Sequence, residues 1–289
     1  MCRPTLVRPA VWLVLRVTLV ALALEACGGG GGGGEAAGAE EKLVHIVEIE
    51  GKRVLYVRCT GSGSPTAVMG AGDEVDGSYY VNAEWAVSRK ARTCLYERAK
   101  LGRSDTAPGP RQLPDLVGDL ERFLDSAELP GPYVLVGASG DGYIMAGYAE
   151  KHPDRVAGMV LVDTPAPWLI VDPPQGIVEH TDPDNPENIE HCDYLQVAKD
   201  AWEARRRIGK IPVRVISADY PGTYIEQEPF PETRKDMRHN VEGQKGWLVL
   251  SPRAKQIVVH SGHGVLDEEP EVVIEAILKV VKEARAKEG

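Results

Sequence analysis

The stretch that decides the fold is Tyr133-Val134-Leu135-Val136-Gly137-Ala138-Ser139-Gly140-Asp141-Gly142. Its first four residues are apolar throughout, which is typical of a strand covered on both faces. A turn of small residues follows around Ser139, and residues 142–151 then predict a helix. A serine on a sharp turn between a buried strand and a helix presents its hydroxyl at the edge of the sheet, and flanking glycines let strand and helix approach closely. The stretch therefore predicts an accessible nucleophile, Ser139.

Strands and helices alternate on both sides of this stretch. Short apolar or alternating segments predict strands at 44–49, 53–58, 67–69, 93–96, 133–136, 159–162, 213–216 and 256–259. Apolar residues at helical spacing predict helices over 79–88, 112–127, 142–151, 194–207 and around 273–281. Alternation of this kind favours the α/β class, with a mostly parallel sheet and helices on both faces.

Composition limits the possible functions. The chain has 289 residues, of which 43% are hydrophobic and 26% charged, which suits one large domain after a leader. The formal net charge is -10, and no basic cluster could follow a phosphate backbone. We therefore expect no nucleic-acid partner.

The N-terminus predicts export. A basic start at Arg3 and Arg8 precedes an apolar run over 10–24, and Leu24-Glu25-Ala26-Cys27 resembles a bacterial lipobox. That resemblance implies a lipoprotein-type signal peptide over 1–27, lipidation of Cys27 and a membrane anchor in the bacterial cell envelope. The glycine-rich residues 28–42 then predict a flexible linker before a domain over 43–289. An ordinary cleaved signal peptide, giving a secreted protein, is the alternative.

Four further motifs surround the Ser139 turn in a fixed order. They are Gly70-Ala71-Gly72-Asp73, Tyr96-Glu97-Arg98-Ala99-Lys100-Leu101-Gly102-Arg103-Ser104-Asp105, His152-Pro153-Asp154-Arg155-Val156-Ala157-Gly158 and Ser261-Gly262-His263. With these motifs the chain resembles the α/β-hydrolase superfamily over nearly all of its length from Leu43. The resemblance implies an α/β-hydrolase fold with a short lid over about 165–207. It also implies a serine hydrolase that cleaves an ester or small amide of a small-molecule acyl substrate through an acyl-enzyme, without metal or organic cofactor.

The resemblance assigns roles to individual residues. Ser139 is the nucleophile and His263 the base, and the backbone N–H groups of Asp73 and Gly140 form the oxyanion hole. Two aspartates are candidates for the acid of the triad. Asp163 ends the strand at 159–162 and is preferred, while Asp219 follows the strand at 213–216 and is the runner-up.

Three residues depart from the family's pattern. Asp141 stands where the Ser139 turn usually has glycine, Asp73 adds a second acid beside the oxyanion position, and Lys100 replaces a glycine. Because negative charge there would oppose an oxyanion, the two aspartates motivate a second hypothesis, a catalytically inactive binding lipoprotein on a hydrolase-like fold.

The remaining cysteines of the domain suggest a disulfide. In the superfamily, the strands that hold Cys59 and Cys94 are neighbours in the sheet. Adjacent strands lie about 5 Å apart, which a disulfide can bridge, and export permits oxidation. We therefore predict a Cys59–Cys94 bridge, with Cys192 as the odd thiol. The cysteine and histidine spacing predicts no zinc site.

Overall fold

The computed structural model describes residues 43–49, 53–70, 72, 77–127, 129–166, 173, 178–179, 181–227 and 231–288. All of them belong to the compact unit Glu40–Gly289. The other unit, Met1–Ala39, lies outside the described residues, and so do the predicted signal peptide and Cys27. None of the described helices is long and apolar enough to cross a membrane.

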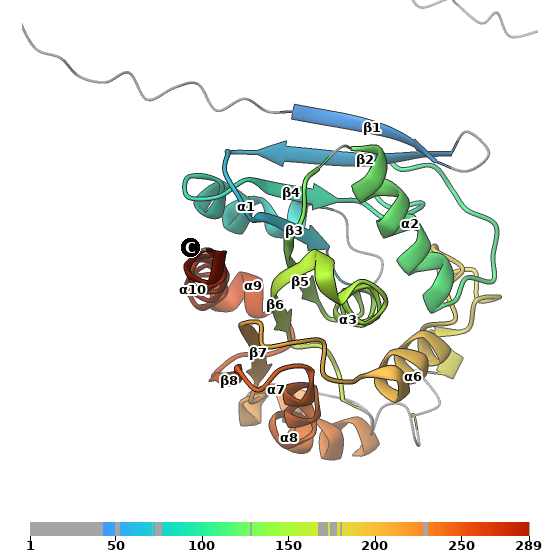
Figure 1. The fold of residues 1–289 in the computed structure, drawn as a ribbon. Coiled ribbons are helices and arrows are strands. Elements are labelled where there is room, and N and C mark those ends of the chain that lie inside the picture. The colour runs from blue at the N-terminus through green and yellow to red at the C-terminus, as the bar shows by residue number, and fades with distance from the viewer. Residues whose placement is uncertain are drawn as a thin grey trace, which may run out of the picture. The chain divides into compact units, whose positions relative to one another are not determined.

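An eight-stranded sheet runs through the Glu40–Gly289 unit in the order β1-β2-β4-β3-β5-β6-β7-β8 (Figure 1). The strands are β1 (Leu43–Ile49), β2 (Arg53–Thr60), β3 (Thr66–Gly70), β4 (Thr93–Tyr96), β5 (Tyr133–Ala138), β6 (Val156–Val162), β7 (Val213–Ala218) and β8 (Ala254–Val259). The pairs β1–β2 and β2–β4 are antiparallel, and all other pairs are parallel. The predicted α/β class and mostly parallel sheet are therefore confirmed.

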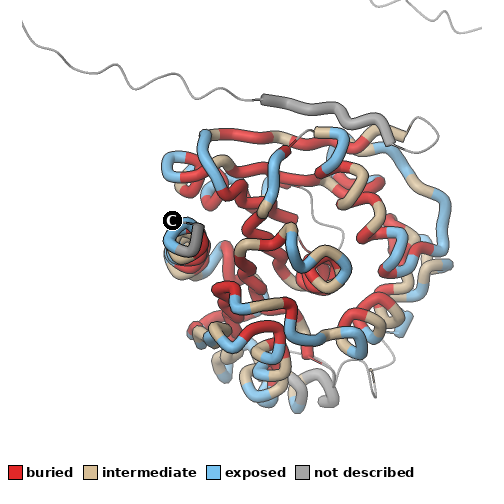
Figure 2. Tube along the Cα trace, in the orientation of Figure 1, coloured by how far each residue is buried: buried red, intermediate tan, exposed pale blue. Residues whose placement is uncertain are grey.

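Helices cover both faces of the sheet. Figure 1 shows α1 (Val81–Ser88) and α10 (Pro270–Glu288) on one side, and α2 (Leu113–Ser126), α3 (Asp141–Lys151) and α6 (Tyr194–Ala204) on the other. Alternate residues of β5 belong to the two cores on either side of the sheet. Tyr133 and Leu135 lie in the core with α2 and α3, and Val134 and Val136 lie in the core with α1 and α10. The strands β3, β4, β5 and β7 are buried along their whole length (Figure 2), which agrees with their mostly apolar sequences. Arg214 and Ser217 of β7 are buried polar exceptions.

Three helices between β7 and β8 were not predicted. They are α7 (Gly222–Gln227), α8 (Pro231–Gln244) and the 3-10 helix η4 (Lys245–Leu250). The sequence of α8 is almost entirely polar, and the residues it buries are Asn240 and Gln244 rather than an apolar stripe. Hydrophobic periodicity therefore gives no signal for this helix.

The remaining short helices are the 3-10 helices η2 (Gly77–Tyr80) and η3 (Pro153–Arg155), and α9 (Val265–Glu268). The sequence predicted one helix over 79–88. The structure has the 3-10 helix η2 up to Tyr80 and the α-helix α1 from Val81 to Ser88. Lys100, which replaces a glycine of the family's pattern, adopts the left-handed conformation with φ 70°. The local turn is therefore kept despite the substitution, at the steric cost that a side chain adds there.

The predicted lid over 165–207 divides into two parts. Residues 167–172, 174–177 and 180 lie outside the described residues. The C-terminal part of the predicted lid forms the helix α6, which packs on α2 and α3. It buries Tyr194, Val197, Ala198 and Ala201 in the core. This part of the stretch is therefore a member of the helical layer, and a lid role for the rest stays a prediction.

A disulfide joins Cys59 of β2 to Cys94 of β4, as the sequence analysis predicted. The two residues stand directly opposite each other in the antiparallel register. Cys192 is a buried free thiol. The bridge fastens the N-terminal hairpin to the interior of the sheet.

We expect the double variant Cys59→Ala/Cys94→Ala to lose about 3–4 kcal/mol of unfolding free energy, because the bridge closes a loop with a sequence separation of 35 residues. Urea denaturation followed by circular dichroism under non-reducing conditions measures the difference. The wild type in reducing agent should match the variant. Coincident curves for the oxidised wild type and the variant would contradict a stabilising bridge.

Candidate active site

The turn after β5 holds Ser139 at the carboxyl edge of the sheet. Ser139 has φ 50°, a conformation that residues other than glycine rarely adopt, and its N–H donates to the carbonyl of Val162 at the end of β6. The helix α3 begins two residues later. A Cβ on Gly142 would lie 1.8 Å from Thr164 Oγ1, so only glycine fits against the segment that follows β6. Gly142, three residues after the serine, is therefore required by packing.

Three predicted residues meet at this edge. His263, in the turn after β8, places Nε2 2.8 Å from Ser139 Oγ. Its Nδ1 lies 2.7 Å from Oδ2 of Asp163, which directly follows β6. The side chain of His263 is 50% exposed and that of Asp163 only 2%, so the chain of contacts runs from a solvent-facing hydroxyl to a buried carboxylate.

The runner-up aspartate has a different partner. Asp219 Oδ2 lies 3.0 Å from Nδ1 of His260, whose side chain is 78% exposed, whereas that of Asp219 is 37% exposed. The structure thus brings Asp163, and not Asp219, to His263. Asp163 itself has φ 44°, and its N–H donates to the carbonyl of Ile216 in β7.

The buried carboxylate of Asp163 is surrounded by donors. Its Oδ1 accepts from the N–H of Ala218 at 3.0 Å and from the side-chain amides of Asn240 and Gln244, each at 2.8 Å. Its Oδ2 accepts from the hydroxyl of Tyr220 at 2.8 Å. Burial alone would raise the pKa of Asp163. The hydrogen bond and charge of His263, with the bonds from Ala218 and Asn240, hold that pKa below its ordinary value, so the group is an anion.

Asp141 belongs to a second buried ionic cluster. Its Oδ1 lies 2.6 Å from Arg98 Nη1, and the same guanidinium donates to Glu190 through Nε at 2.8 Å and Nη2 at 2.7 Å. The hydroxyl of Tyr194 also donates to Glu190. Burial alone would lower the pKa of Arg98, but the charges of Asp141 and Glu190 hold that pKa well above its ordinary value. The carboxylate that replaces the family's glycine is therefore paired with a buried cation, which it shares with Glu190.

The predicted oxyanion hole is only partly described. Asp73 lies outside the described residues, but its neighbour Gly72 is close to the nucleophile, since a Cβ on Gly72 would lie 3.2 Å from that of Ser139. The carbonyl of Gly72 accepts from Arg98 Nη2 at 2.9 Å. Gly140 directly follows Ser139 and is the N-cap of α3, where backbone N–H groups favour negative charge.

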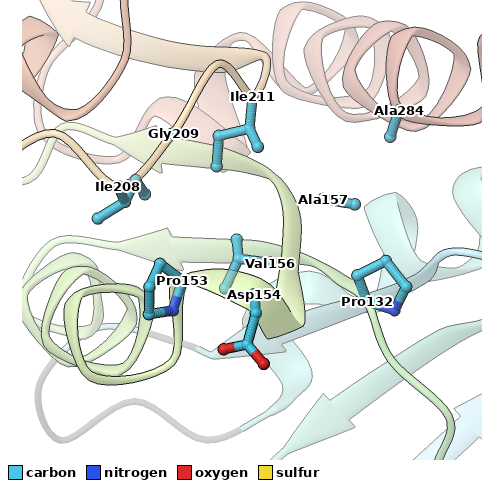
Figure 3. Close-up of a pocket in the computed structure, with 9 residues that line it drawn as sticks. All are labelled: Pro132, Pro153, Asp154, Val156, Ala157, Ile208, Gly209, Ile211 and Ala284. Carbon is cyan, nitrogen blue, oxygen red and sulfur yellow. The ribbon is translucent and has the colours of Figure 1, made fainter. Parts of the chain in front are cut away.

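A pocket of about 290 Å³ lies elsewhere on the sheet (Figure 3). Pro132, which precedes β5, and Val156, which begins β6, are among its lining residues. Ser139 follows the opposite end of β5, about 20 Å away at 3.3 Å per strand residue. This pocket is therefore no part of the Ser139 site. Among the residues that the structure describes, no group of histidine, cysteine, aspartate and glutamate could hold a metal ion.

Residues 76–218 match the family model of the alpha/beta hydrolase fold. With the sheet and the serine turn described above, the chain belongs to the α/β-hydrolase superfamily. It is similar to a thermophilic esterase from Thermogutta terrifontis, with a TM-score of 0.61, 19% identity, and coverage of 84% of this chain and 99% of the esterase. At that identity the likeness shows the fold alone.

Two curated relatives share part of the sequence. The protein named "Probable transporter efuK" of Hormonema carpetanum is 30% identical over 122 residues, which are 39% of this chain but only 18% of that protein. The "Uncharacterized protein YqjL" of Bacillus subtilis is 25% identical over 189 residues, covering 64% of this chain and 71% of that protein.

Six residues of the two buried clusters, around Asp163 and around Arg98, had no role predicted from the sequence. Arg98 lies in one of the quoted motifs, and Glu190 and Tyr194 lie in the predicted lid over 165–207. Tyr220 follows β7, and Asn240 and Gln244 share one face of α8 at i, i+4 spacing. That spacing becomes visible only once residues 231–244 are known to be helical.

We expect Arg98→Met to lower the free energy of unfolding by about 3–5 kcal/mol, because it leaves the buried carboxylates of Asp141 and Glu190 without their cation. Urea denaturation gives the value. Arg206→Met is the matched control: Arg206 pairs with Glu150 but is 68% exposed, so its loss should cost less than about 1 kcal/mol. Equal losses in the two variants would mean that the buried cluster contributes no more than a surface pair.

Proposed function

We propose that the protein is a serine hydrolase that cleaves an ester or small amide through an acyl-enzyme on Ser139. The observation that carries the proposal is the continuous chain of contacts from Ser139 Oγ through both ring nitrogens of His263 to Asp163. A superfamily member with this arrangement has a nucleophile, a base and an orienting acid within hydrogen-bond reach of one another.

The state of Asp163 sets the proton positions. An ionised carboxylate can only accept, so the proton of the His263 ring resides on Nδ1 and is donated to Asp163. This leaves Nε2 as an acceptor toward the hydroxyl of Ser139, which is the tautomer that a general base requires.

The reaction then proceeds in two halves. Ser139 Oγ forms a bond to the substrate's carbonyl carbon while His263 Nε2 takes the hydroxyl proton. The bond from carbon to the leaving group breaks, and His263 returns the proton to the departing alcohol or amine. Water next attacks the acyl-enzyme, with His263 again taking and returning a proton, and the free acid leaves. The backbone N–H groups of Gly140 and Asp73 are proposed to hold the oxyanion in both halves.

The competing hypothesis of an inactive binding lipoprotein rested on the charges of Asp141 and Asp73. The contact between Asp141 and Arg98 favours the enzyme, because the adjacent guanidinium weakens the repulsion that this buried carboxylate would exert on an oxyanion. Arg98 also bonds the carbonyl of Gly72, so the same cation supports the loop that precedes Asp73.

A fluorophosphonate probe tests the enzyme against the scaffold. We expect covalent labelling of wild type at Ser139, shown by peptide mass spectrometry, and none of Ser139→Ala. Hydrolysis of short acyl esters should fall by about 10⁴-fold in Ser139→Ala. Folded wild type that neither labels nor hydrolyses a panel of esters and aminoacyl amides would favour the binding protein.

The assignment of the acid has its own test. Asp163→Asn should lower kcat by about 10⁴-fold, because an amide at this position permits the wrong tautomer of His263. Asp219→Asn is the matched control and should leave kcat within about twofold, since its partner is the exposed His260. The reverse pattern would transfer the role to Asp219.

We further propose that the protein is exported and anchored in the bacterial cell envelope through lipidated Cys27. The lipobox-like sequence supports this, and so does the Cys59–Cys94 disulfide, since such bonds persist in oxidising compartments. Mass spectrometry of the mature N-terminus should find a diacylglyceryl group on Cys27. A mature protein that begins after Cys27 and carries no lipid would indicate a secreted form.

A further inference from the structure

Tyr220 is the residue nearest the Asp163–His263 contact that the proposed mechanism does not use. Its hydroxyl lies 2.8 Å from Asp163 Oδ2 and 3.2 Å from His263 Nδ1. Because the carboxylate only accepts, the phenol donates its single proton to Oδ2. Asp163 Oδ2 therefore receives two donors, Tyr220 and His263.

The other carboxylate oxygen is fully occupied. Oδ1 accepts from Ala218, Asn240 and Gln244, and Gln244 also donates to Asn240 Oδ1 at 2.9 Å, which fixes the two amides to each other. The orientation of the carboxylate is thereby set from α8 and β7. Only Oδ2 remains to interact with His263, so any second donor on Oδ2 acts directly on that contact.

The backbone of Tyr220 gives an independent indication. Tyr220 has φ 49°, and its N–H donates to the carbonyl of Ser261 at 3.1 Å. A residue with a side chain is disfavoured in this conformation by about 1–2 kcal/mol, whereas glycine adopts it readily. A bulky side chain kept at a strained position beside a reactive group is a common feature of functional sites.

We propose that Tyr220 is a positioning residue of the hydrolase, whose hydroxyl shares Asp163 Oδ2 with His263 and thereby limits how tightly His263 holds a proton. The inference rests on the proposed function. Without the phenol, the charge on Oδ2 would face Nδ1–H alone and favour the doubly protonated ring, which cannot act as a base. With it, the ring is held in place while Nε2 stays available near neutral pH.

Other ionisable groups face the pair from neighbouring elements. Tyr79 of η2 faces Asp163 and the acids Asp267 and Glu268 of α9, and Glu268 also acts on Tyr220. Burial, followed by the charge of Asp163, raises the pKa of Tyr220 well above its ordinary value, so the phenol keeps its proton and remains a donor. Since the two acids of α9 are present in wild type and variants alike, a shift caused by Tyr220 is separable from their effect.

The test is Tyr220→Phe, compared with wild type on one acyl ester from pH 5 to pH 9. We expect the acid limb of kcat/KM to move to higher pH by up to about one unit, equivalent to a tenfold tighter hold on the proton. We expect kcat at the optimum to fall by about tenfold with KM unchanged. Tyr224→Phe is the matched control, because the hydroxyl of Tyr224 bonds Glu268 instead, and its acid limb should coincide with that of wild type.

Replacing Tyr220 with 3-fluorotyrosine gives the opposite test and keeps the shape of the side chain. Fluorine makes the phenol a stronger donor, so the acid limb should move to lower pH. A Tyr220→Phe variant that loses activity without moving the acid limb, or a fluorotyrosine form that shifts the limb upward, overturns the positioning role. If Tyr220→Phe does not fold, the fluorotyrosine form alone decides.

A failure of the proposed function can be distinguished from a failure of the role of Tyr220. Wild type that is not labelled by the fluorophosphonate probe refutes the hydrolase itself. Wild type that is labelled, together with a Tyr220→Phe profile that matches wild type, refutes only the role of Tyr220.

Discussion

A carboxylate that is buried must be surrounded by donors, and the arrangement around Asp163 follows from that constraint. With its side chain 2% exposed, Asp163 cannot rely on water, and four protein donors besides His263 replace the solvent. These donors come from the end of β7, the turn after it and α8. The segment between β7 and β8 therefore holds one negative charge in place next to His263, in addition to burying Trp247 and Leu250 of η4 in the core.

Arg98 is a second buried charge near Ser139 whose partners come from separate parts of the chain. It binds Asp141 from the start of α3, Glu190 from the segment before α6 and the carbonyl of Gly72, so three separate stretches are held by one guanidinium. A carboxylate in the serine turn is tolerated because this cation is beside it. A Cβ on Gly70 would lie 2.0 Å from Asp141 Oδ2, which shows how closely β3 and the turn enclose that carboxylate.

The parts of the fold that depend on apolar patterning could be predicted, and those that depend on buried polar groups could not. The strands around Ser139, the order of the motifs and the disulfide followed from local sequence and resemblance. The helix α8 was missed because it buries Asn240 and Gln244. The sequence favoured Asp163 over Asp219 only through the resemblance, since both aspartates follow parallel strands. The distinction arises from which one is covered by α8 and which one meets His260 in solvent.

The position of the disulfide has a mechanical consequence. The hairpin of β1 and β2 forms one edge of the sheet, with Leu43 opposite Cys59, so a pull arriving from the N-terminal side opens the hairpin one backbone hydrogen bond at a time from the Leu43 end. Peeling would continue along β2 from Arg53 until it reached Cys59, where the covalent bond transfers the load to β4. Since β4 lies between β2 and β3 in the sheet, any further extension has to separate β4 from β3. The bridge therefore marks the point at which the opening of the hairpin stops and the parallel part of the sheet begins to bear the load.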